Sequence, residues 1–245
     1  MNPPPKNNEI YSRQDYWTAR FDQEVTYEWL VDYSQIKDVI DGHVDKNSAI
    51  LILGCGNSLL GQDMIRDGFK SIHSLDYCEN VVTMMSNHCD SCQQINWMTC
   101  DARWLPFKDA HFDCIIEKAT LDTFVVKEKS PWTLSPSTSS LIDKVLGEVS
   151  RVLAEDGLFI SISFSQPIHR TPLYSCPAYE WNIKSVSKIG EEFYHHLYMM
   201  KKGLPSDQAV HVSSYEPPIT TESTGKSSEM NFDDEFENDI FAMNV

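Results

Sequence analysis

The sequence has no uninterrupted apolar run of the roughly 18 residues that a membrane-spanning helix needs. Its opening segment, MNPPPK, also lacks the apolar core of a signal peptide. Both absences argue against membrane insertion and against export. We therefore expect a cytoplasmic protein without a membrane partner.

Cysteine is scarce as well, with seven residues among 245, and Cys89 and Cys92 form a C-x-x-C motif that has no second copy. A structural zinc site of the common type needs two such pairs, or one pair followed by spaced histidines. A chain of this length does not need disulfide bonds to be stable, and an odd count leaves at least one thiol unpaired. We predict reduced thiols and no bound metal.

Basic residues are few, because 20 lysines and arginines stand against 36 acids and the formal net charge is −16. Residues 204–245 hold nine of the acids and one lysine, and the rest of the chain is also acidic. Such a surface repels phosphate backbones and attracts basic proteins. We expect a monomer that does not bind nucleic acid and that acts on a basic protein partner.

Hydrophobic periodicity divides the chain into a flexible lead (1–9), one domain (10–203) and an acidic, disordered tail (204–245). Strands are expected at 49–53, 71–76, 95–99, 112–118 and 158–164, and helices at 10–21, 34–41, 59–67, 80–88 and 139–153. Two more strand-like runs, 179–187 and 192–201, suit an antiparallel hairpin at a sheet edge. The alternation predicts an α/β fold with a doubly wound, mostly parallel sheet.

The most informative segment joins the first expected strand to a glycine loop. Gly54 and Gly56 follow the apolar run 50–53, and Asp76 ends the second expected strand twenty residues after Gly56. Glycine lets the backbone approach a ligand, and an acid at this place accepts hydrogen bonds from ribose hydroxyls. The pattern predicts a cofactor that contains a nucleoside.

Three cofactor classes suit such a loop. ATP and GTP sites need a lysine that meets phosphate charge, and this loop has none. NAD sites prefer a third glycine where this chain has Leu59, which weakens NAD without excluding it. S-adenosylmethionine carries no phosphate, and Asp101 after the third strand is placed to accept from an adenine amino group. The residues favour S-adenosylmethionine.

Three motifs together resemble a known superfamily. They are Leu53-Gly54-Cys55-Gly56-Asn57-Ser58, Asp76-Tyr77 and Glu117-Lys118-Ala119-Thr120-Leu121-Asp122. They are similar to the class I S-adenosylmethionine-dependent methyltransferases. Within that class they most resemble the methyltransferase-like branch acting on lysine of translation elongation factor 1A, related to the endothelin-converting-enzyme-2 locus. The similarity covers about residues 10–203, and it implies a seven-stranded Rossmann-like sheet and methyl transfer to a protein lysine.

The resemblance also implies a set of cofactor-binding residues, among which N-terminal aromatics close the pocket. The set is Trp17, Phe21, Trp29, Gly54, Gly56, Asp76, Tyr77, Asp101, Ala102 and Lys118. Aromatic faces suit a sulfonium cation. Four positions depart from the family. Ile52 stands where an acid is usual, Ser58 where the glycine motif usually ends in glycine, Phe21 where a tyrosine is usual, and Ala119 replaces a glycine. A methyl group at Ala119 either crowds the substrate or forces a backbone conformation other than the one that glycine adopts there.

Glu117 and Asp122 are the candidate catalytic residues, because they flank the end of the fourth strand, where doubly wound sheets place their active crevice. A lysine acceptor, whose ordinary pKa is near 10.4, must lose its proton before it attacks a methyl group. We expect Glu117 to support the cofactor side of the site. We expect Asp122 to orient the amine or to accept from it.

Other functions stay open on the sequence alone. The departures at Ser58 and Ala119 suit a non-catalytic S-adenosylmethionine-binding interaction protein. The glycine loop also suits an NAD-dependent oxidoreductase. Because no acceptor pocket is defined, a methyltransferase of another protein or of a small molecule is a further alternative.

Overall fold

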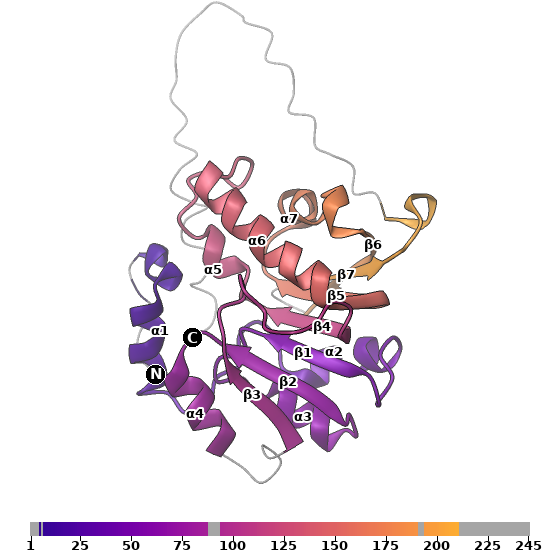
Figure 1. Ribbon diagram of the computed structural model, residues 1–245. Coiled ribbons are helices and arrows are strands. Elements are labelled where there is room, and N and C mark those ends of the chain that lie inside the picture. The colour runs from indigo at the N-terminus through magenta and orange to yellow at the C-terminus, as the bar shows by residue number, and fades with distance from the viewer. Residues whose placement is uncertain (1–4, 6, 88–93, 191–193, 211–245) are drawn as a thin grey trace, which may run out of the picture.

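A seven-stranded sheet forms the centre of the protein, with the strand order β3-β2-β1-β4-β5-β7-β6 (Figure 1). The computed structural model describes residues 5, 7–87, 94–190 and 194–210. The strands are β1 (Ala49–Leu53), β2 (Ser71–Asp76), β3 (Ile95–Thr99), β4 (Phe112–Lys118), β5 (Leu153–Ser163), β6 (Trp181–Ile189) and β7 (His195–Lys202). Strands β1 to β5 pair in parallel, and β7 is antiparallel to both β5 and β6. The predicted doubly wound sheet with an antiparallel edge hairpin is confirmed.

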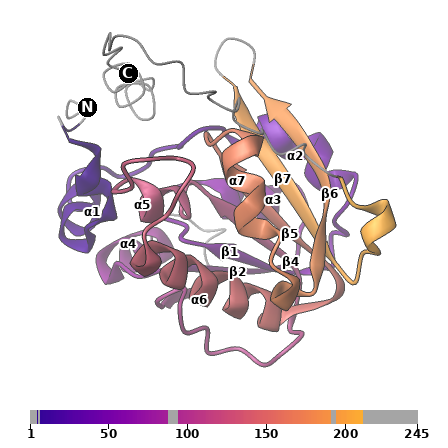
Figure 2. The ribbon, with the colours of Figure 1, turned by 90° about the horizontal axis from the view of Figure 1, so that it is seen from above.

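Helices cover both faces of this sheet (Figure 2). They are η1 (Asn8–Ser12), α1 (Gln14–Phe21), α2 (Tyr33–Asp41), α3 (Leu60–Arg66), α4 (Glu79–Asn87), α5 (Asp122–Val125), α6 (Pro136–Val152), α7 (Pro167–Tyr174), η3 (Pro177–Tyr179) and η4 (Ser206–Gln208). The five helices expected from the sequence are present, with ends that differ by a few residues. The sequence did not predict α5 or α7, since α5 has four residues and α7 contains Pro172.

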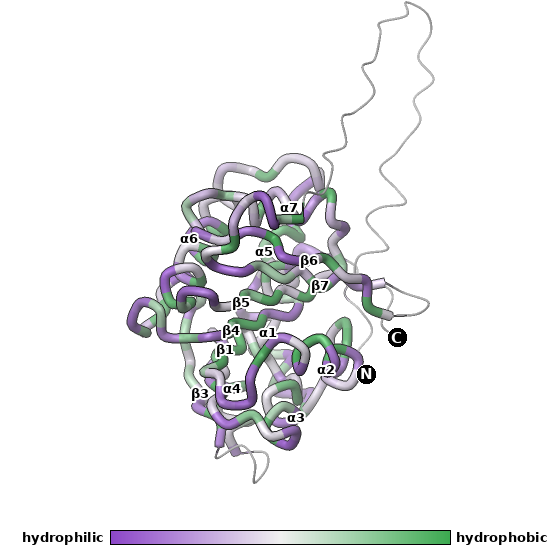
Figure 3. The backbone as a smooth tube through the Cα atoms, turned by 90° about the vertical axis from the view of Figure 1, so that its right-hand side faces the viewer, coloured by the Kyte–Doolittle hydropathy of each residue, from purple (hydrophilic) through white to green (hydrophobic). Residues whose placement is uncertain are grey.

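The apolar run of β1 supplies both faces of the core. Successive side chains of a strand point to opposite faces, so Ile50 and Ile52 pack with α2 and α3, whereas Leu51 and Leu53 pack with α6 and α7. In Figure 3 the hydrophobic residues concentrate along the strands in the middle of the molecule. A parallel strand covered on both faces reads as a continuous apolar run, which is why β1 is recognisable in the sequence.

A third apolar cluster joins the N-terminal segment to α4. It contains Tyr11, Trp17, Phe21, Cys78, Val81, Val82 and Met85, each buried. The segment before β1 therefore packs over the carboxyl end of β2 and the helix that follows it. This placement brings aromatic residues from the start of the chain to the edge of the sheet where ligands bind in doubly wound folds.

The ordered chain is longer at both ends than the predicted domain of residues 10–203. Asn7 caps η1 by accepting from the backbone N–H of Glu9, and Val210 N–H donates to the carbonyl of Ile183 at 2.8 Å. The structure thus describes residues 204–210, which the sequence assigned to the tail, and they include η4. The rest of the acidic tail, residues 211–245, and the C-x-x-C motif of Cys89 and Cys92 lie outside the described residues.

Within the described part of the chain, no helix is long and apolar enough to cross a membrane. The same residues contain no group of three or more His, Cys, Asp or Glu side chains that could hold a metal ion.

Candidate functional site

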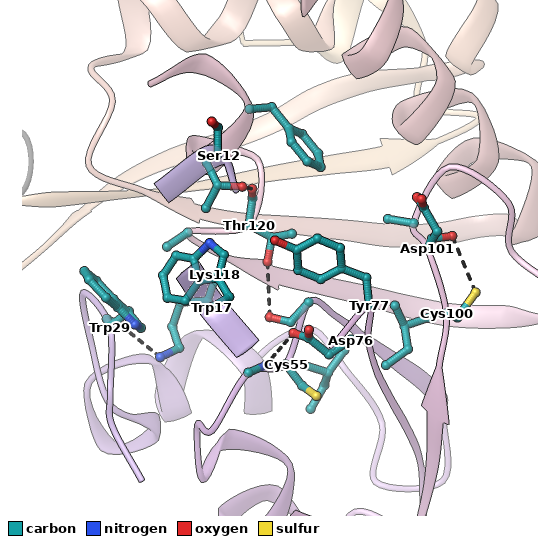
Figure 4. A pocket seen from close by; sticks show the side chains of 18 of the residues that line it. Ser12, Trp17, Trp29, Cys55, Asp76, Tyr77, Cys100, Asp101, Lys118 and Thr120 are labelled. Carbon is teal, nitrogen blue, oxygen red and sulfur yellow. Dashed lines mark hydrogen bonds between the residues drawn. The ribbon is translucent and has the colours of Figure 1, made fainter. Parts of the chain in front are cut away.

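A cavity of about 430 Å³ lies at the carboxyl ends of β1, β2 and β4, under the N-terminal aromatics (Figure 4). All ten predicted cofactor-binding residues line it. They are Trp17, Phe21, Trp29, Gly54, Gly56, Asp76, Tyr77, Asp101, Ala102 and Lys118. Residues that are up to 101 positions apart in the sequence thus form one site.

The glycine loop adopts a backbone conformation that glycine favours. Gly54 has φ +66° and Gly56 has φ +48°. A Cβ atom on Gly54 would overlap the side chain of Thr120, and one on Gly56 would lie 3.4 Å from Phe21 Cζ. The two glycines therefore keep the cavity open and allow a ligand to approach the backbone.

Asp76 fixes the loop from the end of β2. Its Oδ2 accepts from the backbone N–H of Gly56 and its Oδ1 from that of Cys78, each at 2.9 Å. The residue is 5% exposed, and burial raises the pKa of Asp76 while these two hydrogen bonds oppose the rise. Each carboxylate oxygen keeps a lone pair for a further donor such as a ribose hydroxyl.

Three aromatic side chains form an aromatic lid, by which we mean Trp17, Phe21 and Trp29. Trp17 stacks on Phe21 with 5.7 Å between ring centroids and meets Trp29 edge-on at 5.8 Å. The Arg20 guanidinium lies 4.8 Å from the centroid of Trp29. Trp17 is also fixed by donating from Nε1 to the carbonyl of Tyr11 at 2.7 Å. The π faces of the lid are thus held in place by the Tyr11 carbonyl and by Arg20.

Lys118 attaches the aromatic lid to the sheet. Its Nζ donates to Glu28 Oε2 at 2.7 Å and to the carbonyl of Trp29 at 2.8 Å. Burial lowers the pKa of Lys118, and the Glu28 carboxylate opposes that effect. Glu28 also accepts from Ser58 Oγ at 2.8 Å and from the backbone N–H of Leu59. One carboxylate therefore joins the lid, the glycine loop and β4.

Glu28 was not predicted as a site residue. Its segment is conspicuous in the sequence because Tyr27 and Trp29 flank it, but its partner Lys118 is 90 residues away. An acid between two aromatic residues draws attention to this segment, but only the fold shows that Glu28 pairs with Lys118.

Asp101 lies at the predicted place in the cavity, where it pairs with Arg103. Its Oδ1 accepts from the backbone N–H and from Nε of Arg103, each at 2.9 Å, and both side chains line the cavity. Hydrogen bonding to Arg103 lowers the pKa of Asp101, so the carboxylate is held in its charged form. Arg103 is a lining residue that the sequence did not single out.

Glu117 and Asp122 do not belong to the described residues that line the cavity. Glu117 is 1% exposed, and its Oε2 accepts from the backbone N–H groups of Thr120 and Leu121 at 3.0 and 3.1 Å. Asp122 is fully buried, accepts from Ser163 Oγ at 2.6 Å and forms an ion pair with Arg170. The geometry contradicts direct contact between Asp122 and an acceptor amine, since the side chain turns into the core. It is compatible with the supporting role predicted for Glu117.

A further wall of the cavity comes from α5, from Lys127 two residues after it, and from the start of α6, which the sequence did not assign to the site. Its members are Thr123, Phe124, Lys127, Ser137, Thr138 and Leu141. Asp76 and Asp101 are the two carboxylates among the described lining residues, and both belong to the cofactor side. The wall is therefore apolar and hydroxylic, with one cation.

Comparison with known proteins gives a consistent result. The model of a family described as "Methyltransferase domain" matches residues 44–211. "EEF1A lysine methyltransferase 4" of Bos taurus is 36% identical over 81% of this chain and 79% of its own, and the Mus musculus protein is 33% identical over 83% and 81%. The Homo sapiens "eEF1A lysine and N-terminal methyltransferase" is 29% identical over 68% of this chain, which spans 23% of that protein.

Solved structures share the fold at low sequence identity. Magnesium protoporphyrin IX methyltransferase from Synechocystis, with bound SAM, aligns with a TM-score of 0.56 and 13% identity over 82% of this chain and all of its own. The [4+2]-cyclase SpnF aligns with a TM-score of 0.57 and 11% identity over 84% of this chain and all of its own. Because a cyclase and a methyltransferase match about equally well, these two likenesses concern architecture and not chemistry.

Proposed function

Because the chain belongs to the methyltransferase domain family, we propose that it is a protein-lysine N-methyltransferase that uses S-adenosylmethionine and acts on translation elongation factor 1A. The observation that carries the proposal is the cavity itself, in which a two-glycine loop, two acids and an aromatic lid surround one space. The relatives from Bos taurus and Mus musculus, which match over four fifths of the chain, support the lysine acceptor and the elongation factor.

The residues present suit S-adenosylmethionine. A Cβ atom on Gly54 or Gly56 would fill part of the cradle, and buried Asp76 keeps acceptor capacity at the end of β2. The two cationic side chains on the cofactor side are already paired, Lys118 with Glu28 and Arg103 with Asp101. NAD is disfavoured by Leu59, which stands where the dinucleotide loop has its third glycine.

We assign the binding roles as follows. Asp76 accepts from ribose hydroxyls, Asp101 with Tyr77 and Ala102 faces the adenine, and the aromatic lid covers the charged sulfur. When bound, S-adenosylmethionine supplies an electrophilic methyl group on its sulfonium. The Glu28 carboxylate neutralises Lys118, so that the lysine does not repel the cofactor's positive charge.

For the acceptor, the residues described on this side of the cavity contribute position and desolvation, and none of them is a carboxylate. The wall offers Phe124 of α5 and Leu141 of α6 as apolar surface, and Lys127, two residues after α5, as a cation. Both the loss of water and the neighbouring positive charge lower the pKa of an incoming lysine, which favours its neutral, nucleophilic form. The ammonium proton of the substrate lysine is then released to solvent as the amine comes into contact with this wall.

The test is methylation of purified elongation factor 1A by the purified protein with labelled S-adenosylmethionine, followed by mass spectrometry of the product peptides. We expect label on lysine. Parallel reactions with a cell lysate, analysed as protein and as small-molecule fractions, cover the alternatives. Label confined to small molecules, or on a protein other than the elongation factor, overturns the substrate assignment.

Cofactor choice is tested separately by thermal shift. Saturating S-adenosylmethionine should raise Tm by several degrees, whereas NADH at the same concentration should not. A larger shift with NADH would favour the oxidoreductase alternative. A shift with S-adenosylmethionine but no turnover on any protein would favour a non-catalytic binding protein. A substrate of the translation machinery agrees with the predicted cytoplasmic location, and the monomeric state stays a prediction.

A further inference from the structure

Arg170 is a fully buried cation in α7, and the function proposed above does not use it. The residue is 1% exposed, its Nη2 donates to Ser163 Oγ at 2.9 Å, and it forms an ion pair with Asp122. Asp122 is the first residue of α5 and is 0% exposed. The pair therefore connects α7 to α5 inside the core.

A second buried carboxylate lies in the same interior region. Arg170 acts electrostatically on Glu117, which is 1% exposed, and it lowers the pKa that burial raises. One guanidinium thus stands against two carboxylates. Buried ion pairs seldom add stability compared with apolar residues of similar volume, because desolvation offsets their attraction. In some proteins such pairs instead specify one arrangement of the elements that they join.

The element that Arg170 holds is the wall of the cavity. Thr123 and Phe124 of α5 line it, one and two residues after Asp122. Figure 1 shows α5, α6 and α7 together on one side of the sheet. The neighbour of Arg170 on α7, His169, packs edge-on against Trp132 in the loop between α5 and α6, with ring centroids 4.3 Å apart. Helix α7 therefore contacts the segment between β4 and α6 at two places.

From this geometry we propose that Arg170 is a positioning residue: through Asp122 it fixes α5 as the wall against which the acceptor amine is placed. The inference rests on the proposed methyltransferase function and assigns Asp122 to the same unit. It separates the acceptor wall from the cofactor side, which is held by Asp76 and by Glu28 with Lys118.

The contact itself suggests how the pair tolerates change. Arg170 Nε and Nη1, and Asp122 Oδ2, have no hydrogen-bond partner within the described part of the chain. The pair is thus made by one nitrogen and one oxygen and not by the two-point fork that arginine can form. A lysine at position 170 can supply a single donor of the same charge, so it should preserve the position of α5.

The experiment compares Arg170→Met, Arg170→Lys and Asp122→Asn with the full-length wild type. Lys202→Met is the matched control, because Lys202 is a buried cation at the other end of the sheet whose Nζ donates to the carbonyls of Ser150 and Leu153. The measurements are Kd for S-adenosylmethionine by calorimetry, Tm, and kcat and KM for elongation factor 1A at a temperature where every variant is folded.

We expect Arg170→Met and Asp122→Asn to keep Kd within about threefold and to lower kcat by about tenfold or more. Arg170→Lys should return kcat to within about threefold of wild type, and Lys202→Met should lower Tm while kcat is unchanged. If Arg170→Met does not fold, the neutral pair Arg170→Met with Asp122→Asn takes its place, since it leaves neither charge alone.

Three results overturn the proposal. They are a normal kcat in a folded Arg170→Met protein, an equal loss of kcat in Lys202→Met, and a loss of cofactor affinity that accounts for the loss of kcat. An inactive wild type would instead contradict the proposed function, so the two failures are distinguishable.

Discussion

Thr120 lies against Gly54, and its Oγ1 donates to the carbonyls of Leu53 and Gly54 at 3.0 and 3.2 Å. The chain that leaves β4 is thus in contact with the loop that leaves β1, at the floor of the cavity. This contact explains why position 54 accepts no side chain.

Gly54→Ala should destabilise the protein by about 2 kcal/mol or more and abolish measurable cofactor binding. The new Cβ overlaps Thr120, and the backbone at φ +66° is unfavourable for alanine. Urea unfolding and calorimetry measure the two effects. Gly147→Ala is the control, because a Cβ atom there meets nothing within 4 Å in the middle of α6. It should stabilise by about 0.5–1 kcal/mol, and equal effects of the two changes would contradict the argument.

Ala119→Gly should stabilise the folded protein by about 0.5–1 kcal/mol, because Ala119 has φ +63° and left-handed backbone is unfavourable for any residue with a Cβ atom. The sequence predicted that the methyl group either crowds the substrate or forces a backbone conformation unlike that of glycine. The second expectation is wrong, because Ala119 keeps a positive φ that suits glycine. Urea unfolding is the measurement. Ala102→Gly is the control, since Ala102 is equally buried and does not have a positive φ. It should destabilise instead.

Glu28→Gln should lower the free energy of unfolding at pH 7 by about 1–3 kcal/mol, because Lys118 loses the charge that compensates its burial. A buried lysine with a lowered pKa binds fewer protons than its unfolded counterpart. Stability therefore rises with pH between that lowered pKa and the ordinary value of about 10.4. Without the Glu28 charge the pKa of Lys118 is lower still, so the stability of the variant begins to rise at a lower pH than that of the wild type. The difference in unfolding free energy between the two proteins should therefore shrink from pH 7 to pH 9.5.

Urea unfolding at the two pH values measures that difference. Glu180→Gln is the control, since Glu180 is an exposed partner of buried Lys202 at 3.7 Å and its loss should change stability by less than about 0.5 kcal/mol. A difference between wild type and Glu28→Gln that stays constant with pH would exclude Lys118 as the group that responds.

Asp76→Asn should weaken the binding of S-adenosylmethionine by roughly 10- to 100-fold. An amide has one acceptor oxygen, whereas the carboxylate receives the backbone N–H groups of Gly56 and Cys78 on different oxygens. Burial raises the pKa of Asp76, so wild-type affinity should fall on acidification at a higher pH than for an ordinary aspartate. Calorimetry at successively lower pH should show this fall in the wild type and none in the variant. Asp63→Asn, a change of a partly exposed residue on α3 that does not line the cavity, should leave affinity unchanged.

The sheet could be predicted from the sequence because its signals are local. Strand β1 is an apolar run followed by Gly54, β2 alternates apolar and polar residues and ends at Asp76, and β4 has an apolar centre followed by Glu117 and Lys118. Each pattern is visible without its neighbours. Helix α5 has four residues, too few to show a helical period, and α7 contains Pro172 and buries a charged residue, both of which argue against a helix in sequence.

The cofactor side of the site could be predicted for the same reason, since its residues follow strand ends in a fixed order. The acceptor side could not. The carboxylate of Asp122 was expected in the cavity because it follows β4 closely, yet it turns inward to a partner 48 residues later in the chain. Pairing partners at such separation, like Glu28 with Lys118, leave no local pattern.

The position of the aromatic lid has a consequence for synthesis on the ribosome. Trp17, Phe21 and Trp29 are translated before any strand, yet the lysine that holds Trp29 in place is the last residue of β4, 89 residues later. During translation the hydrogen bond between Lys118 and Trp29 can therefore form only after β4 has left the exit tunnel. Until then the aromatic lid lacks this anchor, and its rings are accessible to a chaperone.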